Sequence, residues 1–144
     1  MRAALVYERG ECVYVTSESQ TLDEFWIASP PFTAHESADL EDDALARLVL
    51  AALAESELRI RTPSAATNPL SPVLRLAGVK SLSEFMRGAR AVRVVVVDDE
   101  IEITPMRNAG ARRGFEFLEE KSIRTPNNPL SLSRALSRAR TLAE

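Results

Sequence analysis

The amino-acid sequence predicts an α+β protein in which a mostly antiparallel sheet carries two long helices. Apolar, strand-like segments separated by short turns predict one hairpin over residues 3–16 and another over residues 92–104, whose returning strand alternates apolar and polar residues. Apolar residues recur at helical spacing over residues 39–56 and 131–143, which indicates an amphipathic helix in each half. We therefore expect two β-β-β-α halves with a short helical insert between them and the helices packed on the sheet.

The first half opens with a hairpin. Residues 3–7 and 12–16 are its two strands, and the turn between them contains Gly10. Phe25, Trp26 and Ile27 predict a third, short strand, which the prolines of segment 29–32 are expected to break.

Residues 39–56 give the clearest helical pattern of the chain. Ser37 or Asp39 is a suitable N-cap, and Glu41, Asp42 and Asp43 lie in the first turns, where carboxylates favour the helix dipole. The alternating segment 58–61 that follows predicts a fourth strand.

The predicted insert combines a loop with two short helices. Prolines and polar residues over 62–72 indicate the loop. A helix over 71–76 should end at Gly78, and another over 81–87 should begin at Ser81, because Glu84 occupies the capping-box position.

The second half is similar in order to the first. A strand over 92–97, a turn at Asp98 and Asp99, and a returning strand around 101–104 form its hairpin. A basic loop over 108–114, short strands at Phe115 and Ile123, and the last helix follow.

Spacing supports an internal repeat. Phe25 precedes Leu48, the middle of its helix, by 23 residues, and Phe115 precedes Leu136 by 21.

The bulk composition suits one domain, residues 1–144, in the cytoplasm. A chain of 144 residues is long enough to bury its own core. No apolar run approaches the ~20 residues of a membrane span, and the first residues lack a signal peptide's apolar stretch. The single cysteine fits a reducing compartment.

The inventory of reactive groups predicts no catalysis, no cofactor and no metal site. Nucleophilic catalysis needs a nucleophile with a base in reach, and metal sites need clustered ligands. The chain has one histidine, His35, in a polar segment beside prolines, and one cysteine, Cys12, in a predicted strand. Its five glycines form no phosphate-binding motif.

Two alternative functions stay open. Asp98, Asp99, Glu119 and Lys121 form a carboxylate and lysine set of the kind found in metal-dependent nucleases. Arginines of the C-terminal half would suit a nucleic-acid-binding regulator, although the sequence pI of about 5.3 argues against one. These arginines are Arg107, Arg112, Arg113, Arg134, Arg138 and Arg140.

Charge is divided unevenly along the chain. Residues 1–57 hold twelve acidic and three basic residues, a net charge of −9, whereas residues 58–144 hold nine acidic and fifteen basic residues, a net charge of +6. Such a division either neutralises itself across the fold or indicates an electrostatic partner.

Three segments resemble the CdiI-type immunity proteins of bacterial contact-dependent growth inhibition: TLDEFWI at 21–27, AGVKS at 77–81 followed by Phe85, and NAGARRGFEFLEEKS at 108–122. The terminal helix, with its leucine and alanine spacing, is also similar. The resemblance spans nearly the whole chain. It implies a cytosolic, non-enzymatic protein that binds and neutralises the C-terminal toxin domain of a CdiA effector, commonly a nuclease, one to one.

A nuclease has a basic substrate cleft, so acidic side chains and one large aromatic residue are the expected contacts with such a toxin. These candidate residues are Trp26, Asp39, Glu41, Asp42, Asp43, Glu116, Glu119 and Glu120.

Overall fold

Seven strands form one sheet, at the centre of which β1 and β4 lie side by side. The computed structural model describes all 144 residues. The strands are β1 (Arg2–Arg9), β2 (Cys12–Gln20), β3 (Trp26–Glu36), β4 (Arg90–Val97), β5 (Glu100–Asn108), β6 (Phe115–Phe117) and β7 (Ile123–Pro126). The order is β3-β2-β1-β4-β5-β6, with β7 also paired to β5, and every one of these strand pairs is antiparallel.

Four α-helices and two 3-10 turns complete the fold: η1 (Ser37–Asp39), α1 (Asp42–Ala54), α2 (Ser71–Ala77), α3 (Leu82–Met86), η2 (Glu119–Lys121) and α4 (Pro129–Leu142). The predicted α+β class is thereby confirmed. None of the four helices has the length and apolar composition needed to cross a membrane.

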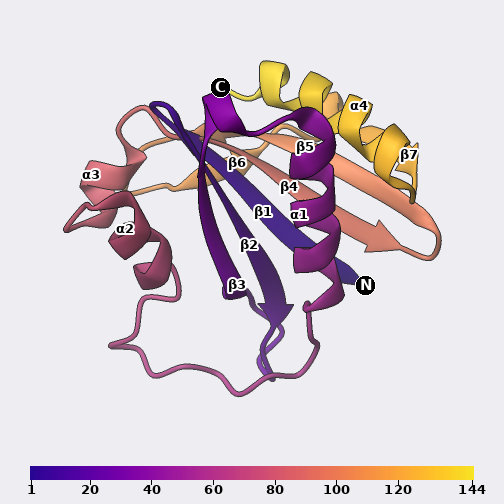
Figure 1. The fold of residues 1–144 in the computed structure, drawn as a ribbon. Helices are drawn as coiled ribbons and strands as arrows, with labels where there is room; N and C mark the ends of the chain where they lie inside the picture. The colour runs from indigo at the N-terminus through magenta and orange to yellow at the C-terminus, as the bar shows by residue number, and fades with distance from the viewer.

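The two long helices pack on the same face of the sheet. Ala4 and Val6 of β1 point to this face, because successive side chains of a strand alternate between faces. They lie in one core with Leu45 and Val49 of α1 and Leu136 of α4. Figure 1 shows α1 and α4 on the same side of the sheet, apart from α2 and α3.

The opposite face of the sheet is only partly covered. Its buried cluster joins Leu5 and Tyr7 of β1 to Val73 of α2 and Phe85 of α3. The ring of Phe85 lies 5.6 Å from that of Tyr7 and 5.7 Å from that of Tyr14, within the range of favourable aromatic pairs. Loop 55–70 carries the chain from the end of α1 around the lower edge of the sheet to α2 (Figure 1).

The expected break at segment 29–32 is wrong, because β3 continues through both prolines to Glu36. Thr16 pairs with Phe32 and the next residue, Ser17, pairs with Ser29, so Pro30 and Pro31 form a bulge between two paired stretches. An edge strand has no second neighbour, and its unpaired positions tolerate a residue without an amide hydrogen. His35 therefore lies in a strand and not in a linker.

The expected strand over 58–61 is also wrong. Only a single parallel bridge between Thr21 and Ile60 forms there, and Arg59 has a positive φ of 64°, which interrupts an extended backbone. The first long helix begins at Asp42, and its N-cap is Glu41, whose side chain makes no capping bond. Neither Ser37 nor Asp39 caps it, because both belong to η1.

The internal repeat and the insert agree with expectation. β1-β2-β3-α1 and β4-β5-β6-α4 flank the two short helices, and β7 is an additional strand of the second half. Gly78 ends α2 with a left-handed φ of 70°, and the Ser81 hydroxyl accepts a hydrogen bond from the Glu84 amide at the start of α3.

Candidate partner-binding surfaces

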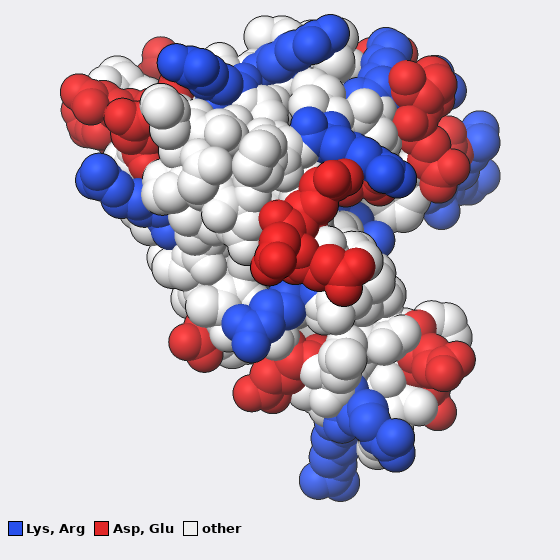
Figure 2. Space-filling view, turned by 90° about the vertical axis from the view of Figure 1, so that its right-hand side faces the viewer, with Lys and Arg blue, Asp and Glu red and all other residues white.

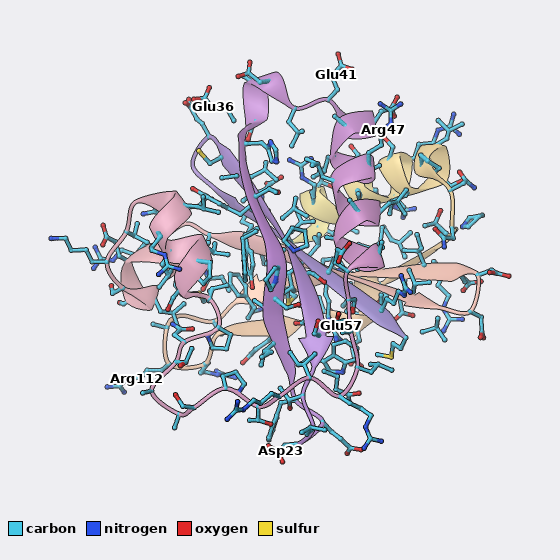
Figure 3. The ribbon with its side chains drawn as sticks, turned by 60° about the horizontal axis from the view of Figure 1, so that its bottom comes forward. Asp23, Glu36, Glu41, Arg47, Glu57 and Arg112 are labelled. Carbon is cyan, nitrogen blue, oxygen red and sulfur yellow. The ribbon has the colours of Figure 1, made fainter.

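The structure places the predicted contact residues in two separate regions. One region is the N-terminal end of α1, where Asp39, Glu41, Asp42 and Asp43 are all exposed; we call these four residues the α1 patch. Glu41 lies at the same end of the molecule as Glu36, and both point outward, whereas Asp23 lies at the opposite end (Figure 3). Within the patch, Asp42 lies 3.9 Å from the Arg140 guanidinium of α4.

The other region is the half of the second sheet face that α2 and α3 leave uncovered. Its centre is an ion pair in which Arg93 Nε of β4 donates a hydrogen bond to Glu18 Oε1 of β2 over 2.7 Å. Glu18 is only 8% exposed, so burial raises the pKa of its carboxyl, and the Arg93 guanidinium acts in the opposite direction. The pair is therefore a nearly buried charge pair in the middle of the sheet.

Two aromatic rings enclose the Arg93 guanidinium. Its central carbon lies 5.3 Å from the ring centre of Trp26 and 5.5 Å from that of Phe117, both within the range of cation–π attraction. Trp26 thus comes from the edge strand β3 and Phe117 from β6, on either side of β4. Trp26, which was predicted as a contact residue, is thus partly buried and already contacts a cation within this chain.

Two adjoining hollows open on this half of the face. The larger has a volume of about 840 Å³ and lies around the β4–β5 turn, and the smaller, of about 350 Å³, lies around Arg93 and Phe117. Val95 and Glu102 line both, so the hollows adjoin, and we call the two together the sheet-face groove. Its other lining residues are Val97, Asp98, Asp99, Glu100, Thr104, Glu119, Ser122, Arg124, Thr125 and Pro126.

The three predicted glutamates in and after β6 have different surroundings. Glu116 forms an ion pair of 2.5 Å with Arg113. Glu119, in η2, lines the smaller hollow, and Glu120 is exposed beside it. Of the predicted contact residues, only Glu119 lines the groove, and Trp26 lies next to it through its contact with Arg93.

The groove carries an excess of negative charge. Arg124 lies 3.6 Å from Glu100 and 3.3 Å from Glu102, which leaves Asp98, Asp99 and Glu119 without an ion-pair partner. Figure 2 shows the side of the molecule on which the β4–β5 hairpin and α4 lie. Acidic side chains form a connected group in the middle of this face, below basic side chains along its upper edge.

The residues of the nuclease alternative do not form a metal site. No three Asp, Glu, His or Cys side chains lie close enough together to share a cation. Lys121 Nζ donates a hydrogen bond of 2.6 Å to Glu144 instead of pairing with Glu119. Cys12 and His35 lie on opposite faces of the sheet and cannot act together. Cys12 packs against the core under α2 and α3, whereas His35 pairs with Val13 and lies with it on the face that α1 and α4 cover.

The arginines of the nucleic-acid alternative are partly neutralised within the fold. Arg140 pairs with Glu8, Arg107 lies 3.5 Å from Glu144, and Arg113 pairs with Glu116. A nucleic-acid surface needs a concentrated field of unpaired cations. These contacts weaken that alternative.

The sequence-based reasoning missed Glu18, Arg93 and Phe117 as a unit. Arg93 is the one charged residue within the apolar run 92–97, and this position in the sequence indicates a buried charge that needs a partner. Its partner Glu18 is 75 residues away in the chain, so the pairing depends on β1 lying between β2 and β4.

Comparison with known proteins shows similarity in structure only. No family model matches the chain, and no curated protein matches it in sequence. A protein of unknown function from Neisseria meningitidis has the same fold, with a TM-score of 0.80 and 14% identity over 99% of this chain and 95% of that one. A chain of the CdiA-CT/CdiI toxin and immunity complex from Yersinia pseudotuberculosis matches with a TM-score of 0.76 and 14% identity over 99% of this chain and 97% of that one.

Proposed function

We propose that this chain is an immunity protein, which binds the C-terminal toxin domain of a contact-dependent growth inhibition effector and neutralises it. The observation that carries the proposal is the agreement in fold, over 99% of the chain, with a chain of a toxin and immunity complex. The three segments that resemble CdiI-type proteins, at 21–27, 77–81 with Phe85, and 108–122, also support it.

The immunity role suits this chain better than the toxin role. A toxin that cuts nucleic acid needs assembled catalytic groups. Here the one histidine and the one cysteine lie on opposite faces of the sheet, and no three metal-ligand side chains converge. Binding to a partner needs only a preformed complementary surface, which an acidic protein can offer to a basic one.

The partner in this proposal is a basic toxin domain, bound one to one in the cytoplasm. A nuclease must attract the phosphate backbone, so its substrate cleft is positively charged. The α1 patch and the sheet-face groove are the two acidic surfaces that such a cleft could meet. An interface of standard size takes about 800 Å² from each partner, roughly a tenth of this chain's 8198 Å² of surface.

Co-expression tests this function directly. The proposal expects the gene upstream of this one to encode a large exoprotein. The C-terminal domain of that exoprotein, expressed from an inducible promoter in a host that lacks both genes, is the probe. We expect induction of the domain alone to stop growth and co-expression of this chain to restore it. The purified mixture should elute as a one-to-one complex.

A toxin domain from an unrelated effector is the control, and this chain should not rescue growth against it. Continued growth arrest despite soluble expression of this chain, together with separate elution of the two proteins, would contradict the proposal.

A further inference from the structure

We propose that the sheet-face groove, and not the α1 patch, holds the toxin domain, and that its occupant is a cationic segment carrying arginine or lysine. This inference rests on the proposed function and goes further, because it assigns the surface and the chemistry of the segment bound there. Its basis is the shape, the unpaired charge and the exposed apolar side chains of the groove.

The groove is the part of the sheet that the chain's own helices leave open. α1 and α4 cover one face of the sheet, and α2 and α3 cover the end of the other face that holds Tyr7 and Tyr14. The remaining half of that face contains the adjoining hollows of about 840 and 350 Å³. A projecting loop or helix end of a partner can therefore enter the groove without displacing any element of the fold.

The charge of the groove selects a cation. Five carboxylates and two guanidinium groups line the two hollows, and both guanidinium groups already have carboxylate partners within the chain. Asp98 and Asp99 at one end and Glu119 at the other have no ion-pair partner. Lysine or arginine side chains of a bound segment would neutralise carboxylates at both ends, whereas an anionic segment would be repelled.

Apolar side chains give the groove a surface that can hold a partner. Phe117 is 48% exposed and Val97 is 51% exposed, unusually high values for large apolar residues of a sheet. One contact of the Phe117 ring, with the Arg93 guanidinium, lies within this chain, and its exposed area remains open to an arginine or apolar side chain of the partner. Aromatic residues at the centre of an interface contribute disproportionately to binding.

The α1 patch also has unpaired carboxylates, at Asp39, Glu41 and Asp43, but no large apolar side chain is exposed beside them. Its four carboxylates line neither hollow of the groove. Those in the first turn of α1 already offset the helix dipole, and Asp42 has Arg140 nearby.

Paired charge reversals separate the two surfaces. The groove variant is Asp99→Arg with Glu119→Arg, and the control variant is Asp42→Arg with Asp43→Arg, which changes the net charge equally at exposed positions. The probe is the toxin domain that the co-expression test identifies, with catalysis disabled so that it can be purified alone. We expect the groove variant to raise Kd at least tenfold, mainly through faster dissociation, and the control to change Kd less than threefold.

Hydrogen exchange on the unmodified complex gives an independent measurement if a variant fails to fold. Amides of residues 98–102 and 115–120 should gain protection when the toxin domain binds. A Kd that responds to the α1 reversal alone, or to neither reversal, would overturn the groove as the binding surface while leaving the immunity function intact, as would unchanged exchange over these segments. Absence of any binding by the wild-type chain would instead remove both proposals.

Discussion

At the scale of single residues, the Glu18–Arg93 pair organises the open half of the sheet. Both side chains are almost completely removed from water, with 10% and 15% of their surfaces exposed. Two charges in such a position attract each other strongly, yet each alone would be costly, because a buried ion without a counterion has lost its hydration. Arg93 Nη2, moreover, is buried without a hydrogen-bond partner. The pair therefore holds the side chains around it in fixed positions but adds little to the free energy of unfolding.

Removing one charge should cost more than removing both. We expect Glu18→Ala to lower the free energy of unfolding by about 3 kcal/mol, because Arg93 is then left as an unpaired buried cation. The double variant Glu18→Leu with Arg93→Met should recover at least half of that loss, since apolar side chains of similar volume avoid the desolvation cost. Urea denaturation of the wild type, of Glu18→Ala and of the double variant measures both losses. Equal losses in Glu18→Ala and in the double variant would contradict the expectation.

A sequence can indicate such a pair only in part. The apolar run 92–97 predicts a strand that contains Arg93, but a charged residue in an apolar run is compatible with many partners. The identity of the partner depends on the register in which Leu5 of β1 lies opposite both Arg93 and Thr16. Registers between strands distant in sequence follow from the whole core, not from local pattern.

At the scale of elements, local signals predicted most of the secondary structure. The hairpins, the short helices of the insert and the last helix all have their turn residues or caps within a few positions. The failures occurred where tertiary context decides. The prolines at 30 and 31 would end a central strand, but β3 is an edge, and the alternation over 58–61 was not matched by a neighbouring strand that could pair with it.

The two long helices also differ at their N-termini. Asn128 caps α4 by accepting a 2.9 Å hydrogen bond from the Ser131 amide, whereas Glu41 precedes α1 without a side-chain bond. We expect Asn128→Ala to lower the free energy of unfolding by about 1 kcal/mol. Glu41→Asp keeps the charge, supplies a shorter side chain suited to capping, and should raise that free energy by about 0.5 kcal/mol. Thermal and urea denaturation of both variants measure whether the first loses and the second gains free energy of unfolding.

At the scale of the whole molecule, the two halves share one core. Val6 and Val13 of the first half lie in the same cluster as Val94, Ile101 and the inner face of α4, and α1 packs against α4 directly. The local repeat of strands and helices could be read from the sequence, but the contact of β1 with β4, which joins the halves, could not. Neither half can bury its apolar residues without the other.

A shared core predicts that the chain unfolds as one cooperative unit. Trp26, the only tryptophan, reports on the first half and on the groove through its contact with Arg93, while far-ultraviolet circular dichroism reports on all helices and strands. The urea midpoints from Trp26 fluorescence and from circular dichroism should coincide. Two separate midpoints would show that the halves are independent domains, contrary to the single-domain prediction for residues 1–144.

The bulge in β3 also protects this protein against aggregation through its exposed sheet edge. An edge strand ordinarily presents a row of unpaired amides and carbonyls. A strand of a second molecule can form hydrogen bonds with this row, which is a first step towards fibrils. Here Pro30 and Pro31 interrupt that ladder at its middle, since neither has an amide hydrogen to give. Many copies of the chain can thus share a concentrated solution without their sheets joining edge to edge.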